Sequence, residues 1–278
     1  MRITHRVGHA LTTRGKQSPD GVKEWAQAEP IAKLVIAELN NYEGVVQKRV
    51  DDPTGKVDKS LSTLVAEVNN FKADVHIDYH LNAHGNGATW TTGHGTEVFV
   101  NTRKPKEAVE LATKVLNNIV SATGFRNRGV KFYDWEMVKS PKATNILVEI
   151  CFMTNKDDVS IVRSTDGQIK IAAAIVEAVV SQYKLKRKKE VVKPKEVETL
   201  SLQDVKPKAT PSKGIGVVRI LQNTVLREEP VYTSPTIRPL KKDQEYHVYG
   251  IKNGWFNGGS GWIHSGSVFF LPTRDLEI

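Results

Sequence analysis

The feature that most constrains the fold is an alternation of short Val- and Ile-rich runs with longer amphipathic segments in the first two-thirds of the chain. Five runs have the length and β-branched composition of strands: residues 2–7, 44–50, 73–80, 95–100 and 145–152. Four segments have apolar residues at helical spacing: 25–41, 61–72, 105–124 and 166–185. Strands that alternate with helices predict an α/β domain whose mostly parallel sheet is covered by helices on both faces.

A basic segment, residues 184–213, divides the chain. It contains ten Lys and Arg against four Asp and Glu, with three Pro and no aromatic residue. Such a composition cannot bury enough apolar surface to offset the entropy of ordering, so we expect a linker. Residues 214–278 form short alternating runs separated by Gly, Asn, Ser and Pro, which is typical of a small all-β barrel. We therefore predict an α/β domain over 1–183, a linker over 184–213 and a β domain over 214–278.

Composition and charge exclude several classes of protein. The net charge is +9, but residues 1–183 contain 23 Lys and Arg against 21 Asp and Glu, so we expect no nucleic-acid partner. No run approaches about 18 consecutive apolar residues, so no membrane span is expected. The amino terminus lacks the apolar run of a secretory signal, and the single cysteine, Cys151, cannot form an internal disulfide. These features predict a chain made in the cytoplasm.

Ionisable residues recur where the predicted strands end. His9 follows the first strand, His80 closes the third, and Glu149 interrupts an apolar strand, where a buried carboxylate needs a partner or a task. Glu24 begins the first long helix, where the helix dipole also favours a carboxylate. Because ligands of open parallel sheets bind beyond the carboxyl ends of the strands, we expect these four side chains to converge there.

Two histidines and a carboxylate form a ligand set typical of catalytic Zn²⁺, with the fourth position left to water. The metal would lower the pKa of that water to about 7, and a separate carboxylate, for which Glu149 is suited, would move the proton. No His-Glu-x-x-His signature occurs, so spacing alone is a weak signal. His84 lies four residues after His80, in a Gly- and Asn-containing segment that favours a loop, and we leave it outside the site.

With these residues, positions 2–182 resemble the zinc-dependent N-acetylmuramoyl-L-alanine amidases of the Amidase_3 type, found in bacterial autolysins and phage endolysins. The motifs that carry the resemblance are Gly8-His9, Glu24, His80-Leu81-Asn82-Ala83, and Val148-Glu149 leading through Phe152 to Asn155. Gly95–Val98 and Asn127–Lys131 match a family strand and the loop before the glutamate strand. The chain departs from the commoner pattern in having Ala10 after His9 and no Asp-Pro before Gly8.

The resemblance implies roles for the converging residues. His9, Glu24 and His80 would bind Zn²⁺, and Glu149 would be the catalytic acid and base. Matching the apolar positions of the first helix to the family places the third ligand at Glu24, with Glu29 as the alternative.

The family reaction is hydrolysis of the peptidoglycan amide that joins the lactyl group of N-acetylmuramic acid to L-alanine of the stem peptide. Asn82 and Arg128 are the candidate substrate-binding residues. Arg128 would bind a muropeptide carboxylate or the developing oxyanion, and the alternative is a surface charge in a loop. A non-catalytic wall-binding protein and a zinc peptidase that cuts within the stem peptide are the competing functions.

The small domain resembles bacterial SH3-like cell-wall-binding modules. The matching segments are Val225–Arg227, Pro239–Lys242, Asn253–Trp255 and Gly261–Ile263. Trp255, flanked by Gly254 and Asn257, is expected to be exposed and to bind the wall with Tyr232, whereas Trp262 is expected in the core.

Together the two domains predict a phage or prophage endolysin that acts on the cell wall after release from the cytoplasm. A spore or mother-cell autolytic amidase is the alternative. The basic linker would lie near anionic wall polymers or act as a solvated spacer.

Overall fold

The computed structural model of the 278-residue chain describes residues 1–85, 87–188, 216–221, 223–231, 234–252, 255–264 and 267–272. The chain divides into two compact units, Met1–Arg187 and Lys188–Ile278. Of the predicted linker, residues 189–213 lie outside the described residues. None of the helices described has the length and hydropathy that crossing a membrane would require.

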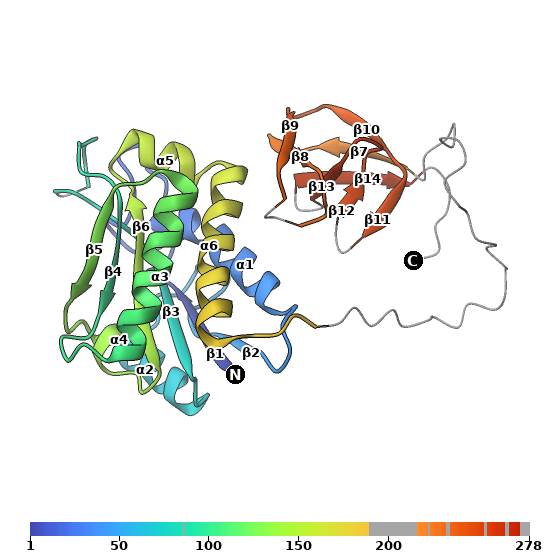
Figure 1. Ribbon diagram of the computed structural model, residues 1–278. Coiled ribbons are helices and arrows are strands. Elements are labelled where there is room, and N and C mark those ends of the chain that lie inside the picture. Colours follow the sequence, from blue (N-terminus) through green and yellow to red (C-terminus); the bar gives the residue numbers. More distant parts are fainter. Residues whose placement is uncertain are drawn as a thin grey trace. The chain divides into compact units, whose positions relative to one another are not determined.

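A six-stranded sheet forms the centre of the first unit, in the order β2-β1-β3-β6-β4-β5 (Figure 1). Its strands are β1 (Arg2–Val7), β2 (Val46–Arg49), β3 (Val75–Asn82), β4 (Thr96–Val100), β5 (Asn127–Phe132) and β6 (Thr144–Phe152). All neighbouring strands in this sheet are parallel except β4 and β6, which are antiparallel. The predicted mostly parallel sheet is confirmed.

Three long helices cover one face of this sheet: α1 (Glu24–Leu39), α3 (Lys106–Thr123) and α6 (Thr165–Tyr183) (Figure 1). Side chains alternate between the faces of a strand, so every second residue of the central strands points into this core. Ile3, Ile77 and Ile146 are fully buried there, together with apolar residues from the three helices. Burial of apolar side chains at about 25 cal/mol per Å² is the main favourable term in folding this unit.

The opposite face carries a smaller apolar cluster and a row of polar side chains. Helices α2 (Leu61–Asn70) and α4 (Glu136–Lys139) contribute Leu64, Val68 and Met137 to that cluster. Asn145, which alternates with the core residue Ile146, donates a hydrogen bond to the Met137 carbonyl, so α4 packs on this second face. The prediction of helices on both faces is therefore confirmed. The same face also presents buried polar residues: Thr4, Arg6, His76, Asp78, His80 and Glu149.

One expectation about local structure is wrong. Asn127–Lys131, expected as a loop, belongs to β5, an edge strand that pairs in parallel with β4. Gly129 has a φ of 87°, and the pairing shifts register between Thr96 and Val98. The strand is half-buried or exposed throughout and interrupted by glycine, so it lacks the Val- and Ile-rich pattern by which the other strands are recognised.

The second unit is all-β in its described residues, as predicted. One sheet has the order β10-β7-β14 and the other β11-β12-β13-β8-β9. The strands are β7 (Gly216–Ile220), β8 (Thr224–Arg227), β9 (Thr236–Leu240), β10 (Glu245–Val248), β11 (Gly250–Lys252), β12 (Trp255–Asn257), β13 (Trp262–His264) and β14 (Val268–Pro272). Val218, Leu226, Val248 and Ile263 are among the residues of its core.

The expected exposure of Trp255 is wrong. Its relative exposure is 4%, and the indole ring packs edge-on against His264, with ring centroids 5.0 Å apart. Trp262, expected in the core, is only half-buried, whereas its neighbour Ile263 is fully buried. The buried Trp255 ring is not placed to stack on a wall ligand. Tyr232, the other predicted wall-binding residue, lies outside the described residues.

Candidate metal centre and active site

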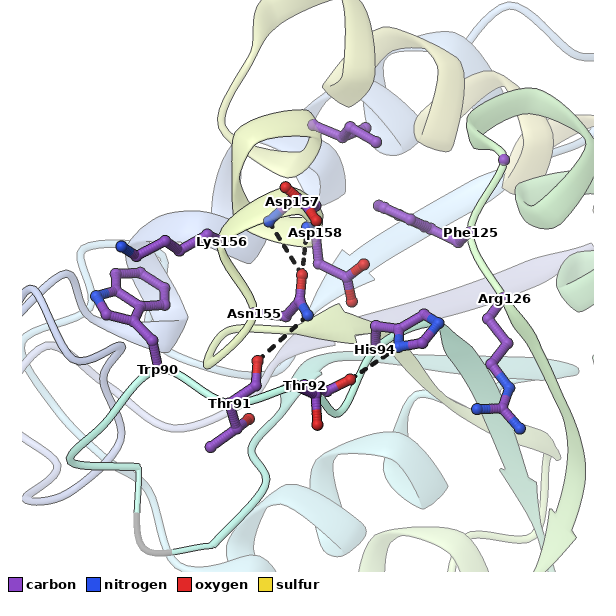
Figure 2. Close-up of a pocket in the computed structure, with 12 residues that line it drawn as sticks. Trp90, Thr91, Thr92, His94, Phe125, Arg126, Asn155, Lys156, Asp157 and Asp158 are labelled. Carbon is purple, nitrogen blue, oxygen red and sulfur yellow. Dashed lines mark hydrogen bonds between the residues drawn. The ribbon is translucent and has the colours of Figure 1, made fainter.

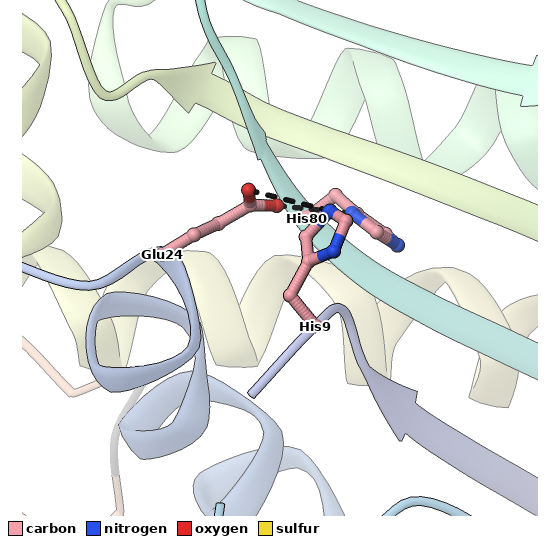
Figure 3. A group of neighbouring side chains, drawn as sticks. All are labelled: His9, Glu24 and His80. Atoms are coloured by element: carbon pink, nitrogen blue, oxygen red, sulfur yellow. Dashed lines mark hydrogen bonds and ion pairs between the residues drawn. The ribbon is translucent and has the colours of Figure 1, made fainter. Parts of the chain in front are cut away.

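Three elements bring His9, Glu24 and His80 together. His9 lies in the turn after β1, Glu24 is the first residue of α1, and His80 lies near the end of β3. Figure 3 shows the Glu24 side chain reaching toward the two imidazole rings. One potential ligand atom from each residue lies within 4.8 Å of the other two, as expected from the positions of the strand ends.

The Glu24 carboxylate contacts both histidines. Its Oε1 lies 2.9 Å from Nδ1 of His80, and its Oε2 lies 3.6 Å from Nε2 of His9. The Leu81 backbone amide donates to the same Oε1 at 3.1 Å, which fixes the carboxylate against β3. The two rings meet edge to face, with centroids 5.2 Å apart. Glu24 and His80 are buried and His9 is half-buried, so the cluster is more accessible at His9.

The backbone of the first turn is adapted to these side chains. A Cβ atom on Gly8 would lie only 2.1 Å from Cε1 of His80, so no residue larger than glycine fits without displacing the ring. His9 itself has a φ of 62°, in the left-handed region that a non-glycine residue rarely adopts. Two imidazole nitrogens and a carboxylate oxygen, held in this way, fit Zn²⁺ by the chemistry of the donors.

Burial and neighbouring charges shift the pKa values of the cluster. Burial lowers the pKa of His9 to about 4, which favours the neutral imidazole that a metal needs. Burial also lowers the pKa of His80, but the Asp78 and Glu24 carboxylates outweigh it and raise that pKa to about 10. For Glu24, burial raises the pKa and the ion pair with His80 outweighs it, so the pKa falls. His80 and Glu24 lie within ion-pairing distance, 2.9 Å, and each favours the charged form of the other.

Glu29 and His84 both lie outside this cluster. Glu29, the alternative ligand, is buried but forms ion pairs with Arg49 at 2.8 Å and Lys33 at 3.3 Å, so it is already neutralised elsewhere. His84 is exposed, as its predicted loop position suggests.

Glu149 lies beside the cluster. It is the register partner of His80 on the neighbouring strand β6, and it is buried. Its Oε2 has no hydrogen-bond partner within the described part of the chain. Burial raises its pKa to about 8, the His80 charge opposes this rise, and the Glu24 and Glu97 charges add to it. Glu149 is therefore a carboxyl group that can both take up and release a proton near neutral pH.

Glu97 links the two predicted substrate-binding residues and was not itself predicted as a site residue. It is the register partner of Glu149 on β4. Its Oε1 accepts a hydrogen bond from Nδ2 of Asn82 at 2.6 Å, and its Oε2 accepts one from Nε of Arg128 at 3.0 Å. Glu97 is a buried acid within a Val-rich strand, and this same signal singled out Glu149.

Arg128 lies on the edge strand β5 and not in a loop. Its guanidinium lies 4.6 Å from the centre of the Phe152 ring, and its side chain is 30% exposed. The cation is thus partly accessible while Glu97 and an aromatic ring hold it in place.

Figure 2 shows residues that line a cavity of about 680 Å³. Trp90, His94, Arg126 and Lys156 are among its lining residues, which include none of the predicted metal ligands and not Glu149. The Asn155 side chain, which caps helix α5 (Lys156–Val162), forms part of its wall and donates to the Thr91 carbonyl at 3.4 Å.

Comparison with known proteins identifies the family of the first unit. The family model described as N-acetylmuramoyl-L-alanine amidase, Amidase_3, matches residues 5–181. The crystal structure of an N-acetylmuramoyl-L-alanine amidase from Clostridium difficile 630 is 26% identical, covers 66% of this chain and 96% of its own, and has a TM-score of 0.61. The catalytic domain of the CD27L endolysin targeting Clostridia Difficile is 25% identical over 65% of this chain and 97% of its own, with a TM-score of 0.55.

Among curated proteins, the N-acetylmuramoyl-L-alanine amidase LytC of Bacillus subtilis (strain 168) is 29% identical over 116 residues, 41% of this chain and 23% of LytC. The match covers 58% of the uncharacterized protein YqiI from the same strain. The chain thus spans less than two-thirds of these curated relatives. The family match covers more than half of the chain, most of the first unit and every residue of the cluster. This chain therefore belongs to the N-acetylmuramoyl-L-alanine amidase family, Amidase_3.

Proposed function

We propose that the chain is a zinc-dependent hydrolase of peptidoglycan that cleaves the amide between the lactyl group of N-acetylmuramic acid and L-alanine of the stem peptide. The observation that carries this proposal is the convergence of His9, Glu24 and His80 with Glu149 on the adjacent strand. The family match and the likeness to amidase structures support it.

In this proposal His9, Glu24 and His80 hold the ion. Zn²⁺ would supply Lewis-acid chemistry, by polarising the amide carbonyl and making a water molecule more acidic. The low pKa of His9 keeps one ligand ready in its neutral form. Burial of Glu24 and His80 excludes bulk water from the inner side of the site and so strengthens electrostatic interactions there.

Glu149 carries the proton. Its unpartnered Oε2 takes a proton from the attacking water and delivers it to the amide nitrogen as the C–N bond breaks. An amine leaves poorly unless it is protonated, so this transfer is essential for hydrolysis. Positioned general acids and bases typically contribute about 10²–10⁴ in rate. Arg128, partly exposed and anchored on Glu97, would bind a carboxylate of the substrate.

The test measures release of stem peptides from purified cell walls. The wild type should release peptides that begin with L-alanine, lose activity on chelation, and regain it when Zn²⁺ is restored. Glu149→Gln should bind zinc normally and lose at least about 10²-fold in rate. Products cut within the stem peptide would indicate a zinc peptidase instead. Full activity in Glu149→Gln would contradict the proton-transfer role.

We further propose that the enzyme is lytic and that the second unit targets it to the wall. The likeness of the first unit to an endolysin catalytic domain supports a phage or prophage endolysin, with a spore or mother-cell amidase as the alternative. The antiparallel sheets of the second unit are consistent with an SH3-like module. A wall-binding module would raise the effective concentration of the enzyme on an insoluble substrate. Sedimentation of the full chain with purified walls, with and without their anionic polymers, tests the targeting role.

A further inference from the structure

Three aromatic side chains form a contiguous, partly exposed surface on the first unit. The ring centroids of Phe99 and Trp135 lie 4.5 Å apart, and those of Tyr133 and Trp135 lie 4.9 Å apart. Tyr133 is 53% exposed, Trp135 is 39% exposed and Phe99 is half-buried. Large aromatic side chains are stabilised by burial, so a group of rings left in contact with water indicates a binding surface. We call Phe99, Tyr133 and Trp135 the aromatic platform.

The aromatic platform lies on the same face of the sheet as the active site. Phe99 follows Glu97 by two residues on β4, and side chains alternate between the faces of a strand, so both project from one face. The register agrees, because Glu97 pairs with Glu149 on β6 and Phe99 pairs with Leu147. Neighbouring strands lie about 5 Å apart, and two residues of strand span about 7 Å. A ligand that reaches Glu149 can therefore contact the platform without leaving this face.

Hydrogen bonds hold the platform in place. The backbone amide of Tyr133 donates to the Val100 carbonyl at 3.0 Å, which continues the pairing of β5 with β4. Between the two exposed rings, the Asp134 carboxylate accepts hydrogen bonds from the backbone amide and the hydroxyl of Thr102, at 3.1 and 2.8 Å. Trp135 is the N-cap residue of α4. A ligand would thus meet a segment that is already ordered, which lowers the entropic cost of binding.

The substrate offers a group that fits such a surface. The scissile amide joins a sugar, through its lactyl group, to a peptide, so the glycan and the stem peptide extend from opposite ends of the amide. A pyranose ring has faces of C–H groups that pack on an aromatic ring, and hydroxyls around its edge that need polar partners. Lys131 is the register partner of Phe99 on β5, and its exposed ammonium can donate to sugar oxygens. The stem peptide instead carries carboxylates, for which Arg128 is the predicted partner.

We propose that the aromatic platform is a sugar-binding subsite that holds the glycan strand of peptidoglycan while the amide lies beside Glu149. This inference rests on the proposed amidase function. The platform lies one strand across and two residues along from Glu149, so it is placed for a sugar beyond the N-acetylmuramic acid that carries the amide. None of its three rings belongs to the predicted metal ligands or proton carrier, so it contributes to substrate binding and not to the chemical step.

The test compares two soluble substrates that carry the same stem peptide, one on a single N-acetylmuramic acid and the other on a glycan tetrasaccharide. The full-length wild type should have the lower KM for the tetrasaccharide substrate. Tyr133→Ala should raise that KM about 2- to 10-fold, as expected for the loss of one aromatic stacking contact, and leave kcat within about twofold. On the single-sugar substrate its KM should stay within about twofold of the wild type. Tyr133→Phe keeps the ring and should restore the wild-type KM.

The matched control is Phe132→Ala. Phe132 precedes Tyr133 in the chain and is 38% exposed, but it pairs with the core residue Val100, and its ring centre lies 4.8 Å from Nζ of Lys104. Its side chain therefore projects from the other face of the sheet. The KM of this variant should stay within about twofold of the wild type on both substrates. Circular dichroism establishes that each variant is folded.

A second measurement uses the wild type and does not depend on how a variant folds. A glycan tetrasaccharide without stem peptides has no amide to cleave, so it binds without turnover. On its addition, the aromatic NMR signals of Tyr133 and Trp135 should shift. The signals of Tyr42, which lies beyond the end of α1 opposite Glu24, should not.

The outcomes separate the platform from the amidase function. Unshifted signals of Tyr133 and Trp135 would overturn the inference, as would an unchanged KM in folded Tyr133→Ala. An equal rise in KM on both substrates would assign the platform to the peptide side and would also overturn it. If the wild type released no stem peptide from either substrate, the amidase function itself would be refuted. Normal release that is independent of glycan length would refute only the sugar-binding subsite.

Discussion

Replacing Gly8 with alanine tests how tightly the first turn is built around His80. The new Cβ would lie 2.1, 2.3 and 2.5 Å from three atoms of the His80 ring, whereas ordinary van der Waals contact begins at 3.4 Å. Relief therefore requires a displacement of about 1.3 Å, the difference between 3.4 and 2.1 Å. The backbone of Gly8 cannot easily supply it, because its amide donates to the Tyr79 carbonyl at 2.9 Å and holds the turn against β3. The ring of His80 must move instead.

That displacement is several times the tolerance of a metal site. Zinc–nitrogen bonds are about 2.0–2.1 Å long, and a usable site keeps its ligands within about 0.2 Å of the ideal distance. We expect Gly8→Ala to lower zinc affinity at least about 100-fold, as judged from the 10–100-fold cost of disturbing only the outer partners of ligands. Overpacking should also lower the free energy of unfolding by about 1–3 kcal/mol.

Zinc content after dialysis, chelator competition and urea unfolding measure these effects. Gly250→Ala is the control, since its new Cβ would meet the nearest atom, Asn257 Cβ, at an ordinary 3.9 Å. If Gly8→Ala bound zinc as tightly as the wild type, His80 would not be the ligand whose position the turn determines.

Three further predictions follow from buried groups. Burial depresses the pKa of His5 to about 3 and of His76 to about 4. As the pH falls below 6.5, the ordinary pKa of histidine, these two imidazoles take up protons in the unfolded chain but stay neutral in the folded chain. Their contribution to the free energy of unfolding is therefore complete above pH 6.5 and is lost as the pH falls toward the pKa values of the folded state. Each of these histidines should contribute a loss of about 2 kcal/mol between pH 8 and pH 5. The raised pKa values of His80 and Glu149 act in the opposite direction, so the measurement compares urea unfolding of the wild type with that of His76→Gln, and pH profiles of the same shape would contradict the burial argument. Trp255→Ala should destabilise the second unit by about 3–5 kcal/mol in the same assay, because the ring is buried; a change below about 1 kcal/mol would indicate an exposed ring. Glu97→Gln removes a charge that raises the pKa of Glu149, so the ascending limb of the pH–rate profile should move to lower pH, and an unmoved limb would mean that the two carboxylates do not interact.

Periodicity predicted the elements of the first unit well, but it carries no information on strand direction. The run at 95–100 is recognisable as a strand, yet nothing in it indicates that β4 lies antiparallel to β6. The edge strand β5 escaped prediction because half-exposed strands need no apolar alternation. The exposure of Trp255 was predicted wrongly because its Gly and Asn neighbours suggest a turn, whereas the residue lies on β12 and its ring packs against His264 on the neighbouring strand.

The convergence of the three predicted metal ligands could be anticipated because each lies where an element begins or ends, and the ends of parallel strands meet. Their supporting residues could not. Asp78 forms an ion pair with Arg6, 72 residues earlier in the chain, and only the register of β1 with β3 brings the two residues together. In the same way, Glu97 becomes part of the site because it is aligned with Glu149 across β4 and β6.

The two faces of the central sheet carry different kinds of side chain. On β3, Val75, Ile77 and Tyr79 contribute to the apolar core, while His76, Asp78 and His80 project from the other face. Substitutions of the core-facing residues would change mainly the packing, whereas substitutions of Asp78 and His80 would change the surroundings of the predicted metal site. One strand therefore divides these two tasks between alternate residues.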